Sequence, residues 1–228
     1  MKLTLLALTL ASASTMSASI IFYAESAGAQ FSHLGGTTVE TFDSLNPGAL
    51  GPYTSSIGNY SPGGAVVGAN IWGGSNNTSY MAVGQESGGS SYSLTFGAAQ
   101  SFFGFYWLAM DAANQVQFYN GSTLVASFSS SDVSAILSSA YLGNPNTSTD
   151  PSEKFAFIGF LSDNTATNFT SVAFNSLNPG TGFETDSHTT LAGSGEISSS
   201  TPEPSTLALM VPALGALAVA ARRRYVRN

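Results

Sequence analysis

Few side chains in this sequence have the types and spacing that catalysis needs. Histidine, the commonest general base, occurs only at His33 and His188. The sequence has no Gly-x-Ser-x-Gly nucleophile turn, no His-Glu-x-x-His zinc motif and no Gly-rich phosphate-binding loop. It also has no cysteine to act as nucleophile or thiolate ligand. We therefore expect a protein that is not an enzyme.

Three carboxylates are the candidates for a metal site. Asp43 lies near the start of the central region, and Glu184 and Asp186 lie near its end. If the first and last strands pair, these side chains become neighbours, and their oxygens suit Ca²⁺. The alternative is that they are solvated surface charges. Apart from this structural calcium ion, we expect no cofactor.

Two further functions depend on single residues of the same region. Trp72 precedes Gly73-Gly74 in a polar stretch, and an exposed ring there can contact a sugar, so a carbohydrate-binding module is the alternative function. Glu184 and Asp186 could serve glycoside hydrolysis. Neighbours on one strand do not straddle a substrate, however, so a hydrolase is the least favoured class.

The charge distribution excludes nucleic acid as a partner. The formal net charge is −7, and five of the six basic residues lie in the two ends of the chain. Between residues 30 and 200 there are eleven acidic side chains, and Lys154 is the one basic side chain. Neutralising a phosphate backbone requires clustered Lys and Arg. The abundance of Ser, Thr, Asn and Gly is instead similar to that of secreted bacterial surface proteins.

The N-terminus predicts a secretory signal peptide over residues 1–29. Lys2 supplies the positive start, and an apolar run over residues 3–13 is too short to span a membrane. Ala27 and Ala29 have the small side chains of a cleavage site before Gln30, although Ala11-Ser12-Ala13 also fits. A signal peptidase is the processing enzyme that this pattern requires.

The C-terminus combines three features in a fixed order. Pro202, Glu203 and Pro204 come first, then an apolar run over residues 207–221, then a basic cluster over residues 222–227. As a transmembrane helix the run would rise about 22 Å, slightly short of a hydrocarbon core. The cluster, which contains Arg222, Arg223 and Arg224, should stay cytoplasmic, leaving the large domain outside.

This three-part end closely resembles the PEP-CTERM sorting signal of Gram-negative bacteria. The resemblance implies that an exosortase, a membrane-embedded processing enzyme, recognises Pro202-Glu203-Pro204 and removes the tail. It also implies an inner-membrane intermediate, a final place at the cell surface or in the extracellular matrix, and a link to exopolysaccharide and biofilm. The three motif residues are then parts of a substrate and carry no catalysis. The alternative is an ordinary membrane-anchored protein in which Pro-Glu-Pro is part of a linker.

Residues 30–191 predict an all-β domain, followed by a Ser/Gly-rich linker over 192–201. Asn120-Gly121 predicts a two-residue hairpin turn, with Leu124, Ala126 and Phe128 on one face of its second strand. We expect an antiparallel two-sheet sandwich of jelly-roll type, with one short helix at 131–142. The nine expected strands cover residues 38–42, 81–83, 92–96, 102–108, 115–119, 123–128, 155–161, 169–175 and 182–190.

The middle of the chain also resembles a family of exosortase-dependent surface proteins. The similarity lies in Phe103-Gly104-Phe105-Tyr106-Trp107, Phe118-Tyr119-Asn120-Gly121 and Phe183-Glu184-Thr185-Asp186. That family has no established catalytic chemistry, so the resemblance implies no active site. The primary hypothesis is a non-catalytic exported surface or matrix protein that an exosortase sorts and processes and that is linked to exopolysaccharide or biofilm, with extracellular polysaccharide as a candidate partner.

Overall fold

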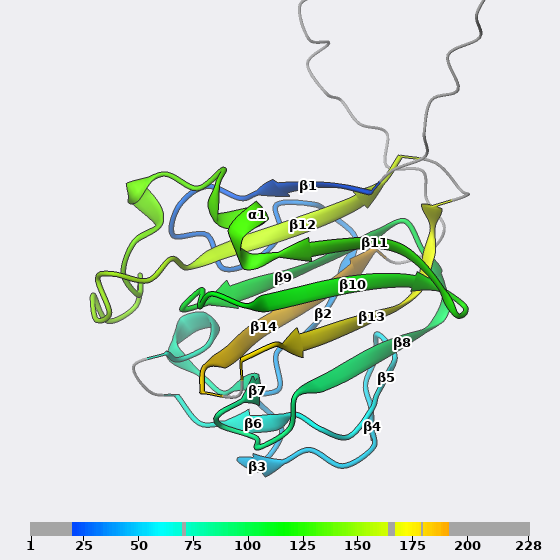
Figure 1. Cartoon of the computed structure of the whole chain (residues 1–228), viewed down its shortest axis with the longest axis horizontal. Coiled ribbons are helices and arrows are strands. Elements are labelled where there is room, and N and C mark those ends of the chain that lie inside the picture. Colours follow the sequence, from blue (N-terminus) through cyan, green and yellow to red (C-terminus); the bar gives the residue numbers. More distant parts are fainter. Residues whose placement is uncertain (1–19, 70–71, 164–166, 179, 192–228) are drawn as a thin grey trace, which may run out of the picture. The chain divides into compact units, whose positions relative to one another are not determined.

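The computed structural model describes residues 20–69, 72–163, 167–178 and 180–191. They form two antiparallel β-sheets with only short helices, which confirms the predicted two-sheet, all-β architecture (Figure 1). The predicted linker, the predicted transmembrane helix of the sorting tail, and residues 1–19 of the predicted signal peptide lie outside the described residues. Within the described ranges, no helix has the length and apolar character that a membrane span needs.

Sheet A is the larger of the two and contains eight strands, every neighbouring pair antiparallel. Strand β14 is its most connected member, because it pairs with β9, β7 and β2. The strands in order across the sheet are β1 (Ile20–Ala24), β12 (Ala156–Ser162), β9 (Phe102–Leu108), β14 (Gly182–Leu191), β7 (Tyr80–Gly84), β6 (Ala65–Val67) and β3 (Gly48–Ala49), with β2 (Thr37–Glu40) beside β14.

Sheet B covers one face of sheet A with six strands. In order they are β11 (Thr123–Ser129), β10 (Asn114–Asn120), β13 (Phe169–Ser176), β8 (Ser91–Gln100), β5 (Asn59–Tyr60) and β4 (Tyr53–Thr54). The chain passes repeatedly between the sheets, from β8 to β9 to β10 and again from β11 to β12 to β13 to β14. The nine predicted strands are present, and the structure adds β1 and the short strands β3 to β6.

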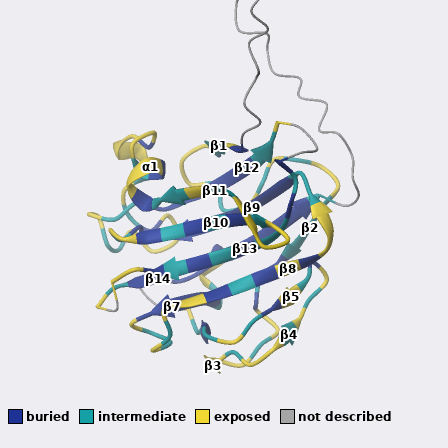
Figure 2. Ribbon diagram, turned by 45° about the vertical axis from the view of Figure 1, so that its right-hand side comes forward, coloured by how far each residue is buried: buried dark blue, intermediate teal, exposed yellow. Residues whose placement is uncertain are grey.

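Aromatic side chains fill the space between the sheets. Phe103, Phe105 and Trp107 point from β9 into this core and meet Phe174 of β13 and Phe183 of β14. The other face of β9 is also buried, because Tyr106 packs with Phe157 in a second cluster on the outer face of sheet A. Figure 2 shows the burial along these strands. Burial on both faces explains why residues 102–108 read as a continuous apolar run.

The predicted hairpin at Asn120-Gly121 is confirmed, and one of its details is wrong. Strands β10 and β11 pair up to Asn120 and Thr123, and Gly121 has the positive φ of 58° that such a turn requires. The register shifts between Phe118 and Tyr119. Because a one-residue shift turns side chains to the other face, Leu124 is 49% exposed instead of sharing the core face with Ala126 and Phe128.

The predicted helix at 131–142 is much shorter than expected. Helix α1 covers Ser130–Ser134, and a 3₁₀ turn, η2, follows at Ser139–Tyr141. A second 3₁₀ turn, η1, lies at Ser75–Asn77. The N-cap of α1 is Ser129, in a reciprocal capping box with Asp132. Lys154 Nζ donates to the carbonyls of Ser134 and Leu137 at 2.9 and 2.8 Å, which satisfies the helix end.

Candidate functional site

An acidic pocket of about 410 Å³ opens on the outer face of sheet A. The ends of β7 and β9 meet the start of β14 there, because Gly84 pairs with Gly182 and Leu108 pairs with Glu184. The side chains that give the pocket its character are Trp72, Gln85, Glu86, Asp111, Glu153 and Glu184. Among the residues that the structure describes, neither Lys nor Arg lines this space, so it favours hydrogen-bond donors and disfavours anions.

Glu184 and Glu86 form a buried carboxyl pair at this pocket. Glu184 is 5% exposed, and its burial together with the charge and hydrogen bond of Glu86 raises its pKa to about 10. Burial also raises the pKa of Glu86, whose Oε1 accepts a hydrogen bond from Tyr80 at 3.0 Å. The Oε2 atoms of both glutamates are buried without a hydrogen-bond donor among the described residues. The pair therefore holds a proton at neutral pH.

Gly182 makes room for the Glu184 carboxyl. A Cβ atom at position 182 would collide with Glu184 Oε1, so no larger residue fits without moving the glutamate. Asp111 and Glu153 complete the acidic lining. Burial raises the pKa of Asp111, and burial together with the charges of Asp111 and Asp150 raises the pKa of Glu153.

Asp186 occupies a different environment from Glu184. One carboxylate oxygen accepts the Ser75 backbone N–H at 2.6 Å, and the other accepts the Ser187 N–H at 2.6 Å. Burial raises the pKa of Asp186 to about 8, although the two hydrogen bonds act to lower it. The strand register shifts here, and Ser187 has a φ of 51°. Asp186 therefore anchors the η1 turn to a bulge in β14.

The histidines have structural roles. His188 is fully buried among aromatic rings, stacked on Phe174 at 4.9 Å between centroids. Its ring nitrogens lie 3.0 Å from the Tyr60 hydroxyl and 2.9 Å from Thr185 Oγ1, and burial lowers its pKa to about 3. The imidazole is therefore neutral and enclosed in the core. His33 lies away from it, with Nδ1 2.6 Å from Glu25 Oε1.

The structure does not gather the three predicted calcium ligands into one site. Glu184 lines the acidic pocket, Asp186 binds backbone N–H groups, and Asp43 is exposed, although its charge contributes to the raised pKa of Asp186. No group of three or more metal-ligating side chains occurs within the described ranges. Trp72 and Glu184 both line the acidic pocket, so the residue predicted to contact sugar and one of the predicted carboxylates belong to one site.

Comparison with protein families identifies the C-terminus. The family model of the PEP-CTERM protein-sorting motif matches residues 200–224. The chain carries a PEP-CTERM sorting signal. This signal marks an exported protein that an exosortase processes and that is sorted to the cell surface. The searches of curated proteins and of solved structures found no match.

The PEP-CTERM match contains all six predicted sorting residues, Pro202, Glu203, Pro204, Arg222, Arg223 and Arg224. All of them lie outside the described residues. Of the predicted cleavage-site residues, Ala27, Ala29 and Gln30 are described and follow strand β1, which falls within the predicted signal peptide.

Sequence reasoning missed the other acids of the pocket. Glu86 and Asp111 each follow a buried strand, β7 and β9, while Glu153 precedes β12. A carboxylate directly after an apolar run is a weak signal by itself. It becomes informative only when the pairing of both strands with β14 is known, because that pairing brings their ends to one place.

Proposed function

We propose that this protein is a non-catalytic component of the cell surface or extracellular matrix, built on a sandwich of jelly-roll type. Its tail at 207–221 holds it at the inner membrane until an exosortase acts at Pro202-Glu203-Pro204. The mature domain then associates with extracellular polysaccharide in a biofilm. The PEP-CTERM match at residues 200–224 is the observation that carries this proposal.

The arrangement of polar groups supports a role without catalysis. Glu86 and Glu184 are close enough to share a hydrogen bond. In glycosidases the two carboxyl groups stand on either side of the scissile bond, about 5 Å or more apart. The histidine that could act as a general base, His188, is enclosed by aromatic rings. These contacts favour a binding or structural domain.

Intact mass spectrometry of the protein from its native host tests the sorting step. We expect membrane fractions to contain a precursor and the surface or medium to contain a form that ends near Pro202-Glu203-Pro204. Replacing all three motif residues with alanine should leave the Arg-rich tail on every molecule, whereas Glu196→Gln, in the linker, should be processed normally. An intact tail on the wild-type protein in every fraction would refute exosortase processing.

Carbohydrate binding is a second candidate function, and the acidic pocket favours it. Trp72 is half-buried at the pocket, where an indole ring can pack on the apolar face of a sugar. Glu86, Asp111, Glu153 and Glu184 line the pocket, and their carboxyl oxygens can accept hydrogen bonds from sugar hydroxyls. The size of the pocket, about 410 Å³, falls in the range of small-molecule sites.

A pull-down on polysaccharide from the host tests this second function. Trp72→Ala should lose retention on the polymer, and Phe31→Ala, which removes an exposed aromatic ring, should keep it. Equal retention of both variants argues against the pocket as the binding site. Release of reducing sugar that Glu184→Gln or Asp186→Asn abolishes would overturn the non-catalytic assignment.

A further inference from the structure

We propose that strand β1 belongs to the mature protein, so that the signal peptidase cuts before Ile20 and not after Ala29. Cleavage after Ala29 would remove all five residues of β1, Ile20–Ala24, from sheet A. The backbone of this segment pairs within sheet A, and its side chains pack in the core of the sandwich.

The backbone of β1 completes one edge of sheet A (Figure 1). Each residue of β1 has a partner in β12, from Ile20 opposite Ser162 to Ala24 opposite Ile158. The pairing continues one residue further, where the Glu25 N–H donates to the Phe157 carbonyl at 2.9 Å. Loss of β1 would turn β12, whose first five residues are buried, into an unprotected edge strand, a known aggregation hazard.

The side chains of β1 alternate as a strand of the sandwich requires. Ile20, Phe22 and Ala24 face the core between the sheets. The Phe22 ring lies 5.1 Å from that of Phe128 on β11 and 6.1 Å from that of Phe160 on β12. Phe22 thus bridges the two sheets at their open edge, and its loss would uncover apolar surface of both.

The opposite face of β1 fits a glycine of β12. A Cβ atom at position 159 would lie 2.6 Å from the Tyr23 ring, so the ring occupies the space above Gly159 that a side chain would otherwise fill. The Tyr23 ring also makes an edge contact with His33, with the centroids 6.0 Å apart. Both faces of β1 are therefore matched to residues far away in the sequence.

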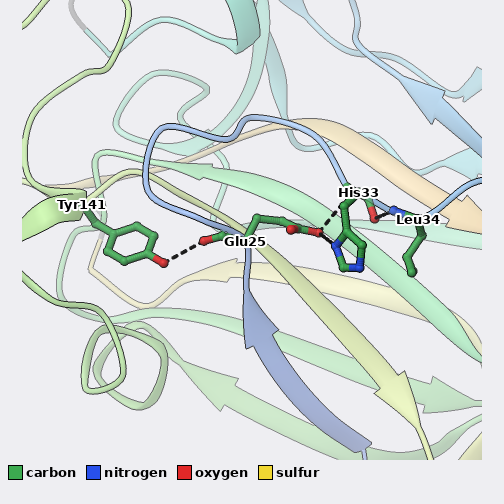
Figure 3. A network of polar contacts seen from close by, with 5 residues as sticks. Glu25, His33, Leu34 and Tyr141 are labelled. Carbon is green, nitrogen blue, oxygen red and sulfur yellow. Dashed lines mark hydrogen bonds and ion pairs between the residues drawn. The ribbon is translucent and has the colours of Figure 1, made fainter. Parts of the chain in front are cut away.

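Contacts across Ala27-Gly28-Ala29 tie β1 to the chain that follows. Glu25 Oε1 accepts hydrogen bonds from the His33 backbone N–H at 3.0 Å and from Nδ1 of its ring at 2.6 Å (Figure 3). On the other side, the Tyr141 hydroxyl donates to the Glu25 carbonyl at 2.7 Å. A cut after Ala29 would separate Glu25 from His33 and leave Tyr141 without its acceptor.

The sequence offers cleavage sites that spare β1. Ser17 and Ser19 place small side chains at the two recognition positions directly before Ile20, and Ala11 and Ala13 do the same further upstream. The signal peptidase cuts the chain before it folds. Only a cut upstream of Ile20 leaves β1 in the mature protein, where its contacts can stabilise the fold.

The full-length precursor, expressed with its own leader in a Gram-negative host, provides the test. Intact mass and N-terminal sequencing of the exported protein should show a start at Ser14 or within residues 15–20. A start at Gln30, or an uncut leader on the exported protein, overturns the proposal. These measurements concern the N-terminus, so their result is independent of exosortase processing at the other end.

Two blocking variants sharpen this result. Ala29→Leu should leave the mature N-terminus unchanged, and the double variant Ala13→Leu with Ser19→Leu should accumulate precursor. The opposite pattern, with precursor accumulating for Ala29→Leu, contradicts the proposal.

A second pair of variants tests whether β1 supports the mature fold. Phe22→Ala should lower the thermal midpoint of the exported protein by about 4 °C. Its neighbour Ile21 is 55% exposed, so Ile21→Ala should leave the midpoint nearly unchanged. Equal midpoints for wild type and Phe22→Ala would show that β1 is not part of the mature sandwich.

Discussion

Replacement of Glu184 by glutamine tests the electrostatics of the acidic pocket. Burial and the neighbouring Glu86 raise the pKa of Glu184 to about 10 in the folded protein, from an ordinary value of 4.5. Glutamine has the shape of the protonated acid and can still donate a hydrogen bond to Glu86. We expect Glu184→Gln to fold, and to differ from wild type mainly in how its stability depends on pH.

The sign and size of that difference follow from proton linkage. Between about pH 6 and pH 9 the carboxyl of residue 184 is protonated in the folded protein and ionised in the unfolded chain. Each pH unit in this window therefore removes about 1.4 kcal/mol from the free energy of unfolding, or about 4 kcal/mol in all. Asp186, with a pKa of about 8, adds a loss of the same sign up to that pH.

Urea unfolding at several pH values measures this slope. The loss of stability from pH 6 to pH 9 should be about 4 kcal/mol smaller for Glu184→Gln than for wild type. Asp132→Asn is the matched control, since it removes an exposed carboxylate whose pKa is lowered by Ser129 and which stays ionised throughout the window. Parallel pH profiles for Glu184→Gln and wild type would refute a buried, protonated Glu184.

Three further substitutions test packing and polar contacts, each by urea unfolding against wild type. Phe105→Ala removes a core ring stacked on Phe160 and should cost about 4 kcal/mol; a loss below about 1 kcal/mol would contradict its place in the core. Gly182→Ala should cost about 2 kcal/mol because its Cβ collides with Glu184, whereas Gly180→Ala should be tolerated because its Cβ would make only an ordinary contact, 3.5 Å from Asn178 Oδ1. Lys154→Met keeps the apolar stem but leaves two carbonyls without their donor, and should cost about 2 kcal/mol; an unchanged midpoint would show that water replaces the ammonium group.

Local sequence patterns were sufficient to predict most of the longer strands in the two sheets. Apolar alternation and Asn120-Gly121 predicted the long strands and the β10–β11 hairpin. The pattern failed for the two-residue strands β3, β4 and β5, which are too short to show a period. It also failed for the helix at 131–142, where contacts of Lys154, 17 and 20 residues from its acceptors in sequence, satisfy carbonyls of a much shorter element.

The candidate site was only partly predictable for the same reason. Trp72 and Glu184 were predicted separately, as a sugar contact and as a calcium ligand, and the structure places both at one pocket. Asp186 was paired with Glu184 by sequence spacing. The register shift after Asp186 and the N–H groups of Ser75 and Ser187 give it a separate structural environment.

The sequence by itself determined the sorting signal, because a linear motif next to an apolar run needs no tertiary contact to be recognised. It also determined the all-β class, since alternation and turn residues are local properties. Only the tertiary structure decided the acidic pocket and the place of β1. The pocket depends on the pairing of β7 and β9 with β14, and β1 depends on its pairing with β12, more than 100 residues away in the chain. Such pairings bury carboxylates and complete the edge of a sheet through contacts that no local pattern specifies.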